Sequence, residues 1–301
     1  MNKYLFGILG LLILAIFAFE PRAEGIGTNH FEGEGISFDY PNSWNITNGT
    51  GSTIASFSDS NGVNVKVMKF GLPPGYNLAT HIQGDVAGTF DQNFVLTSKK
   101  EVQVNGTTAY KRDYTVNGTQ QRKEVRIQKN NLLYSIILTA PREINENSLD
   151  RVISSIKINE SDDDPKYRGW AQIVFPQFNQ KWNFSSWSLN DAGAVKHLSG
   201  FYPGERGQLA LIGHHTTHHA PFLNIKNLKP GNKVIINDYL TQKKYTYAVT
   251  GSEVRMGVKG VDIKYHATED PELWLITCWP PGYSRGAYIV KCKLGSIEPL
   301  N

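Results

Sequence analysis

The chain has 301 residues, of which 40% are hydrophobic and 19% are charged. This composition is typical of folded proteins and excludes global disorder, and the length is sufficient for two domains, each with its own core. The net charge is +4, and no dense cluster of Lys and Arg is interleaved with aromatic residues, so the sequence gives no support for nucleic acid binding.

The N-terminus contains an apolar segment that predicts contact with a membrane. Residues 4–19 carry no charge and follow Lys3, so residues 1–24 are predicted to be a membrane anchor or a signal peptide. A cytoplasmic N-terminus would place the rest of the chain outside the cell. Because no small-x-small cleavage site follows the apolar run, we favour a retained single-pass anchor. The alternative is cleavage near Ala18 or Ala23, followed by secretion.

After a short tether at residues 20–32, residues 30–158 predict an α+β domain. Alternating apolar residues and two Asn-Gly turns, at 105–106 and 117–118, indicate an antiparallel sheet. The predicted strands are residues 36–40, 53–57, 63–70, 101–104, 107–116, 121–129 and 131–139. Two amphipathic helices are predicted to cover this sheet, at residues 78–90 behind an Asn77 cap and at residues 148–156.

A polar, acidic segment at residues 159–168 predicts a linker to a second domain, residues 169–301. The apolar runs of this domain are short and β-rich, which favours an all-β barrel or sandwich. Its clearest predicted strands are residues 172–175, 208–212, 233–237, 244–250, 273–278 and 287–294.

Three side chains at predicted strand ends form a candidate catalytic set. Cys278 ends one apolar run, Arg285 lies seven residues later, and His214 follows another buried run. A thiolate is a strong nucleophile, and a neighbouring guanidinium favours that form and can stabilise an oxyanion. The imidazole can transfer protons to and from amines. A rigid sheet can hold such groups together.

Two other interpretations apply to these residues. The two cysteines, Cys278 and Cys292, would form a structural disulfide by default in an exported protein. However, Cys292 shares one face of its predicted strand with Tyr288, Val290 and Leu294, while Lys291 and Lys293 share the other face, which predicts a buried core residue. The sequence HHTTHH at 214–219 suggests a metal site, but Pro221 and the two threonines favour a loop, and no carboxylate cluster completes such a site.

The motifs in the second domain resemble the sortase family of membrane-anchored cysteine transpeptidases. The resemblance covers residues 170–294 and rests on Ile-Gly-His at 212–214, Leu-Ile-Thr-Cys at 275–278 and Arg285. Supporting positions are residues 203–207, Pro221-Phe222, Leu228 and Pro230-Gly231. Trp274 stands where the family often has Thr, and His215 stands where many members have Arg.

This resemblance implies an eight-stranded barrel whose catalytic residues are Cys278, His214 and Arg285. It also implies that the protein cleaves a C-terminal sorting signal of the Leu-Pro-x-Thr-Gly kind on surface proteins. The acyl group would then pass to an amine of the cell envelope or of a pilin. No cofactor or metal is needed for this chemistry, although an extracellular calcium site, present in some relatives, is left open.

The first domain resembles the PsbP-like family through Ser-Phe-Asp-Tyr-Pro-x-x-Trp at 37–44, the Asn-Gly hairpins and the final strand and helix. That resemblance implies a binding or spacer module and supplies no catalytic residue. Two alternatives to a transpeptidase therefore stay open. One is a surface-exposed binding protein with an inactive barrel, and the other is a cysteine peptidase that uses water as the acceptor.

Overall fold

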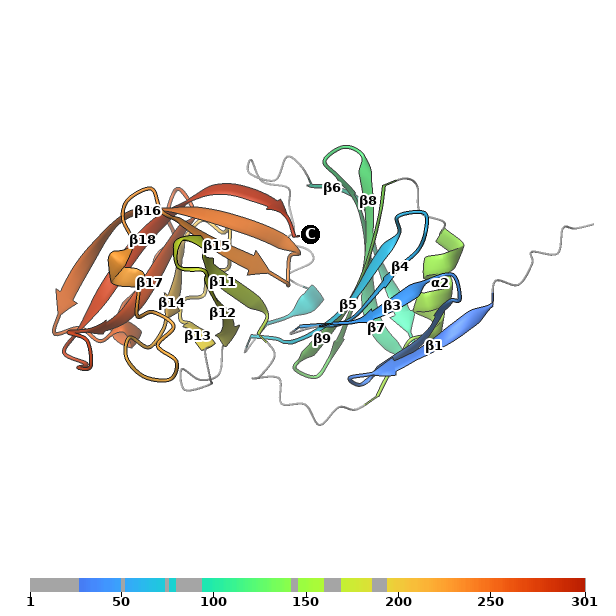
Figure 1. The fold of residues 1–301 in the computed structure, drawn as a ribbon, viewed down its shortest axis with the longest axis horizontal. Coiled ribbons are helices and arrows are strands. Elements are labelled where there is room, and N and C mark those ends of the chain that lie inside the picture. The colour runs from blue at the N-terminus through green and yellow to red at the C-terminus, as the bar shows by residue number, and fades with distance from the viewer. Residues whose placement is uncertain are drawn as a thin grey trace, which may run out of the picture.

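The computed structural model shows two modules side by side (Figure 1). It describes residues 27–49, 52–73, 76–79, 94–141, 146–159, 169–185 and 194–300. The predicted anchor at residues 1–24 lies outside these residues, as do nearly all of the predicted helix at 78–90 and of the linker at 159–168. Within the described part of the chain, no helix has the length and apolarity needed to cross a bilayer.

A seven-stranded antiparallel sheet forms the centre of the first module. Its strand order is β3-β4-β5-β9-β8-β7-β6. The strands are β3 (Asn45–Asn48), β4 (Thr53–Ser58), β5 (Asn64–Gly71), β6 (Phe94–Val104), β7 (Thr107–Val116), β8 (Gln120–Lys129) and β9 (Leu132–Ala140). The Asn-Gly turns join β6 to β7 and β7 to β8 as predicted, with Asn105 and Asn117 in the left-handed conformation that such turns require.

One face of this sheet is covered by a small second sheet and by α2 (Glu146–Ser155). The small sheet has the order β1-β2-β10, formed by β1 (Thr28–Gly33), β2 (Ile36–Pro41) and β10 (Lys157–Ile158). Aromatic side chains of β2, including Phe38, pack with Phe57 in the core between the layers. The segment predicted as a tether thus contains a strand, and residues 36–40 pair outside the main sheet.

The second module is a closed barrel of eight strands in the order β11-β12-β13-β14-β17-β18-β16-β15. Its strands are β11 (Ala171–Phe175), β12 (Gln180–Ser185), β13 (Ala194–His197), β14 (Gln208–Ile212), β15 (Lys233–Asp238), β16 (Lys243–Met256), β17 (Glu272–Trp279) and β18 (Gly286–Pro299). Two pairs are parallel, β12 with β13 and β14 with β17. The predicted fold, a sheet-rich α+β region followed by an eight-stranded barrel, is confirmed.

The two modules share one hydrophobic core. Met68, Phe70 and Leu133, on the second face of the large sheet, belong to the same buried cluster as the interior of the barrel. The ring of Phe70 lies 6.3 Å from the ring of Tyr239 in the barrel. Burial of apolar side chains from both modules stabilises their contact, because the hydrophobic effect scales with the apolar area removed from water.

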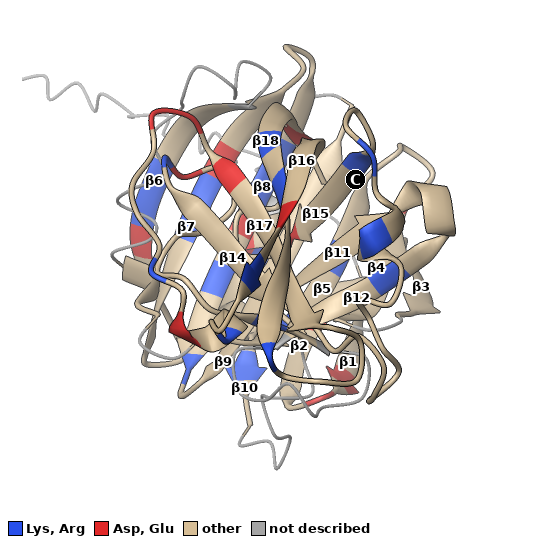
Figure 2. Cartoon of the chain, turned by 90° about the vertical axis from the view of Figure 1, so that its left-hand side faces the viewer, with Lys and Arg blue, Asp and Glu red and all other residues tan. Residues whose placement is uncertain are grey.

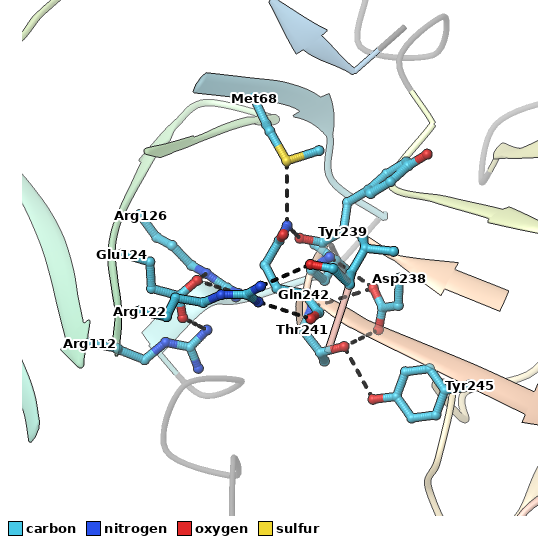
Figure 3. A network of polar contacts seen from close by, with 12 residues as sticks. Met68, Arg112, Arg122, Glu124, Arg126, Asp238, Tyr239, Thr241, Gln242 and Tyr245 are labelled. Carbon is cyan, nitrogen blue, oxygen red and sulfur yellow. Dashed lines mark hydrogen bonds and ion pairs between the residues drawn. The ribbon is translucent and has the colours of Figure 1, made fainter. Parts of the chain in front are cut away.

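Basic side chains of the first module lie near the contact between the modules, and Arg122 bonds directly to the second module. Lys and Arg gather on β7 and β8 (Figure 2). Among them, Arg112 and Arg126 form ion pairs with Glu124 (Figure 3). Arg122 donates to the carbonyl oxygens of Gln242 at 3.5 Å and Leu300 at 2.9 Å (Figure 3). These bonds fix the first module to the start of β16 and the end of β18.

The first module contacts one end of the strand pair β16 and β18, and the opposite end of this pair is remote from it. β16 and β18 pair along their whole length, from Lys243 opposite Pro299 to Met256 opposite Gly286. A strand rises by about 3.4 Å per residue, so a 14-residue strand spans roughly 45 Å. The first module therefore lies far from the Gly286 end of β18.

Asp238 is a buried carboxylate beside the contact between the modules. It accepts hydrogen bonds from the backbone N–H groups of Leu240 and Thr241 and from the Thr241 hydroxyl. Burial raises the pKa of Asp238 to about 6, and these bonds and the positive charge of Arg126 offset burial only in part.

We expect this carboxylate to make stability depend on pH. Its pKa in the folded chain exceeds the value of about 3.9 in an unfolded chain, so the folded state binds the additional proton between about pH 4 and 6. The contribution of Asp238 to the free energy of unfolding therefore falls as pH rises through this window and stays low above it. Asp238→Asn keeps the packing and removes the titration.

Urea denaturation of both proteins at pH 4, 5, 6 and 7.5 measures this effect. We expect Asp238→Asn to gain stability relative to the wild type as pH rises from 4 to 6, by up to about 3 kcal/mol. Comparing the two proteins at each pH cancels the titration of all other groups. A difference in the free energy of unfolding that is constant with pH would contradict the prediction.

Candidate active site

The candidate site lies where the parallel strands β14 and β17 end at the same edge of the barrel. Their register pairs Leu211 with Leu275 and Ile212 with Ile276. The pairing extends one residue further, because the Gly213 N–H donates to the Ile276 carbonyl at 3.1 Å. Continued by two residues beyond Ile212, the same register would set His214 opposite Cys278. The Ile-Gly-His and Thr-Cys motifs thus lie on adjacent strands.

Two motif residues, Gly213 and Thr277, hold β14 and β17 in this register. Thr277 is buried, and its hydroxyl donates to the Gly213 carbonyl at 2.8 Å. Gly213 has no room for a side chain, because a Cβ atom there would lie 2.7 Å from the buried ring of Phe222. The glycine and the threonine beside the proposed catalytic pair therefore hold the register that brings the pair together.

The proposed nucleophile projects on the outer face of the barrel wall. Leu273 and Leu275 belong to the barrel core, whereas Trp274 and Ile276 belong to a separate apolar cluster with Ala287. Because side chains alternate along a strand, Cys278 shares the face of Trp274 and Ile276. The cysteine is half-buried at the strand end.

Arg285 lies in a bend immediately before β18 and is exposed. Cys278 pairs with Ala287 across β17 and β18, so Arg285 precedes the partner of the cysteine by two residues. The guanidinium carbon lies 5.4 Å from the ring centre of Tyr283, and the Arg285 carbonyl accepts from the Gly257 N–H at 2.9 Å.

The loop after β14 holds His214. The Thr217 hydroxyl lies 3.2 Å from Nδ1 of His214, and the rings of His214 and His218 are 4.7 Å apart. His215 is directed inward instead and is 3% exposed, so it does not line the site. Burial, with a smaller effect of the Lys226 charge, lowers the pKa of His215 and favours its neutral form.

The HHTTHH segment at residues 214–219 forms a loop rather than a helix, as Pro221 and the two threonines predict. Among the described residues, no group of three or more His, Cys, Asp or Glu is arranged to hold a metal ion.

The two cysteines differ in environment. Both are free, and Cys292 faces the barrel core opposite Leu273, at 1% exposure. Burial strongly raises the pKa of the Cys292 thiol, which disfavours its thiolate form. We therefore expect iodoacetamide to alkylate Cys278 but not Cys292 in the folded protein, and both in urea. Peptide mass mapping checks this, and labelling of Cys292 without unfolding would contradict it.

Comparison with protein families locates a known domain in each module. Residues 171–295 match the family model of the sortase domain, and residues 19–158 match that of PsbP-like protein. Both predicted resemblances are confirmed. A search of curated proteins found no match.

Several solved sortases are similar to the barrel. Sortase E1 from Streptomyces coelicolor, solved with a tripeptide in its active site, is 23% identical, with a TM-score of 0.37 over 44% of this chain and 90% of its own. Listeria monocytogenes sortase A is 20% identical, with a TM-score of 0.38 over 44% and 91%. Sortase C-3 from Streptococcus pneumoniae is 16% identical, with a TM-score of 0.39 over 48% and 71%.

Proposed function

With a sortase domain at residues 171–295 as the premise, we propose that this protein is a cysteine transpeptidase of the cell envelope. The observation that carries the proposal is the strand register at one barrel edge. The register pairs Ile212 with Ile276 and Cys278 with Ala287. This supports a site in which His214, two residues after Ile212, and Arg285, two residues before Ala287, act together with Cys278. A nucleophile, a proton carrier and an oxyanion donor at one edge are the components of acyl transfer through a thioester.

In the first half-reaction, the Cys278 thiolate attacks the carbonyl carbon of a peptide bond. A carbon–sulfur bond forms, and the carbonyl oxygen takes up negative charge that the Arg285 guanidinium stabilises. When the carbon–nitrogen bond breaks, His214 gives its proton to the leaving amine. The product is a thioester on Cys278.

In the second half-reaction, an incoming amine attacks the thioester carbonyl. His214 takes the proton of that amine, a new amide bond forms, and the carbon–sulfur bond breaks to regenerate the thiolate. Thiol, imidazole and guanidinium supply every step, so the proposed chemistry needs no cofactor or metal.

The proposed donors are surface proteins with a C-terminal signal of the Leu-Pro-x-Thr-Gly kind, cleaved after Thr. The acceptor is an amine of the cell envelope or of a pilin. We propose that residues 1–24 anchor the chain, with the N-terminus inside and both modules outside. Because the first module contacts the ends of β16 and β18 remote from Cys278, we propose that it acts as a spacer or docking module rather than as a cover for the site.

The test uses a sorting-signal peptide with and without an amine, followed by mass spectrometry of the protein and the products. We expect an acyl adduct on Cys278 without the amine and a new amide product with it. Hydrolysis alone, even with excess amine, would indicate a peptidase. No adduct and no product with any sorting-signal peptide would overturn the proposal and favour a binding protein with an inactive barrel.

A further inference from the structure

The loop that follows β14 is closed on itself and fixed to the barrel. The Phe222 N–H donates to the His214 carbonyl at 3.0 Å, which joins the two ends of the loop. The Phe222 ring is fully buried beneath Gly213 and lies edge-on to Phe175, with ring centres 6.0 Å apart. His214 is thus the first residue of a loop whose base is held by the barrel core.

The same loop has an unfavourable backbone conformation. His218, His219 and Ala220 have φ values of 49°, 63° and 45°, in the left-handed region that non-glycine residues rarely adopt. Among the described residues, all other non-glycine residues with positive φ are isolated, and this is the only consecutive run. Such backbone conformations persist only where surrounding contacts enforce them, and they cluster at functional sites.

Hydrogen bonds within the loop enforce this turn. The Ala220 N–H donates to the Thr217 carbonyl at 2.8 Å, and the Leu223 N–H donates to the Ala220 carbonyl at 3.0 Å. The turn brings the loop back over the ring of His214. As a result, the Thr217 hydroxyl lies 3.2 Å from Nδ1, and the His218 ring lies 4.7 Å away at a tilt of 35°.

We propose that Thr217 is a positioning residue for His214, an inference that rests on the proposed transpeptidase function. Its hydroxyl oxygen accepts the Nδ1–H of His214 in both protonation states of the imidazole. The charged ring then holds its second proton on Nε2, from which it passes to the leaving amine. The neutral ring keeps its proton on Nδ1, which leaves the Nε2 lone pair to take a proton from the incoming amine.

His218 has a different part in this arrangement. Its tilted ring packs against the His214 ring and restricts rotation out of the plane that the hydroxyl contact defines. A planar ring is sufficient for this packing contact, which does not require an ionisable group. The contact of His218 is therefore one of ring packing, whereas that of Thr217 is a hydrogen bond.

Three threonine variants in the full chain test the role of the hydroxyl. Thr217→Val removes it at nearly constant shape, Thr217→Ser keeps it, and Thr216→Val is a matched control at an exposed neighbour that makes no side-chain hydrogen bond to a described residue. We expect Thr217→Val to lower kcat/KM for transpeptidation by about tenfold, the usual effect of one lost hydrogen bond. Thr217→Ser and Thr216→Val should stay within about twofold of the wild type.

A spectroscopic measurement separates this role from a loss of structure. In protein labelled with ¹⁵N-histidine, with His214 assigned by a His214→Gln variant, the ¹⁵N shifts report which ring nitrogen carries the proton. We expect the Nδ1–H form to predominate in the wild type and in Thr217→Ser, and to decrease in Thr217→Val. Iodoacetamide labelling restricted to Cys278 serves as the check that each variant is folded.

The outcomes distinguish this inference from the proposed function. An active wild type with an equally active Thr217→Val would overturn the role of Thr217 and leave the transpeptidase intact. An unchanged His214 tautomer in a folded Thr217→Val would overturn it as well. Absence of the acyl adduct in the wild type would overturn both, because the proposed proton transfer would then have no reaction to serve.

Discussion

Cys278→Ala is expected to abolish formation of the acyl adduct and of the amide product, with no measurable turnover. The reason is chemical, because alanine has no atom that can form the thioester. The fold should persist, because the side chain is half-buried at a strand end and the change removes only one atom. The measurement is intact-protein mass spectrometry after incubation with a sorting-signal peptide, with thermal unfolding as the check of folding.

Cys292 provides the matched control for this experiment. It is the other cysteine of the chain, and it lies in the barrel core opposite Leu273. Cys292→Ala should keep the acyl adduct and cost only about 1 kcal/mol of stability through a small cavity. Turnover by Cys278→Ala, or loss of the adduct in a folded Cys292→Ala, would show that the nucleophile was assigned to the wrong residue.

Local patterns in the sequence were sufficient to predict most strands of the barrel, but not all of them. The predicted runs at 208–212 and 273–278 correspond to β14 and β17, whose apolar residues fill the barrel on one face. The strands β12 and β13 were not predicted, because they are short and are held by pairing with each other and with their neighbours β11 and β14 rather than by a long apolar pattern of their own. Pairing between strands is not reported by local periodicity.

The contact between the modules was also missed, although one signal for it is present in the sequence. β9 has the sequence LLYSIILTA and is buried almost throughout, on both of its faces. A strand that reads as a continuous apolar run is typical of a sheet covered on both sides. One side of β9 packs towards the small sheet and α2, and the other side, through Leu133, joins the core of the barrel.

In the candidate site, the motif residues were predicted from the sequence, but the contacts within the loop were not. The motifs identified Cys278, His214 and Arg285 as residues of interest, and the strand register shows that the two strands ending near His214 and Cys278 are adjacent. The contacts of Thr217 and His218 were not predicted. They depend on three consecutive left-handed residues, a conformation that a sequence without glycine at 218–220 gives no reason to expect.

Arg285→Ala is expected to lower kcat for acyl transfer by about 10² to 10³, the usual effect of removing one oxyanion donor. The charge on the carbonyl oxygen develops only in the transition state, so the loss should appear in kcat more than in KM. Arg285→Lys should recover part of the rate, because it restores the charge without the planar fork of donors. Steady-state kinetics with a sorting-signal peptide and an amine measure these effects.

Arg255 is the control that makes this test specific. It pairs with Ala287, as Cys278 does from the opposite side, so Arg255 lies on the same face of the sheet as the cysteine. However, its guanidinium is held by Glu253 at 2.6 Å and lies over the ring of Trp274. Arg255→Ala should therefore change kcat by less than about threefold. A large loss in Arg255→Ala with a small one in Arg285→Ala would transfer the oxyanion role to Arg255.

Alkylation of Cys278 separates the two effects that a guanidinium at this position can have. Reaction with iodoacetamide requires the thiolate but forms no oxyanion. If Arg285 acts on the oxyanion alone, Arg285→Ala should lose acyl transfer while the alkylation rate at a fixed pH stays close to that of the wild type. An equal loss in both rates would assign Arg285 to the thiolate instead, because both reactions begin from that form of Cys278.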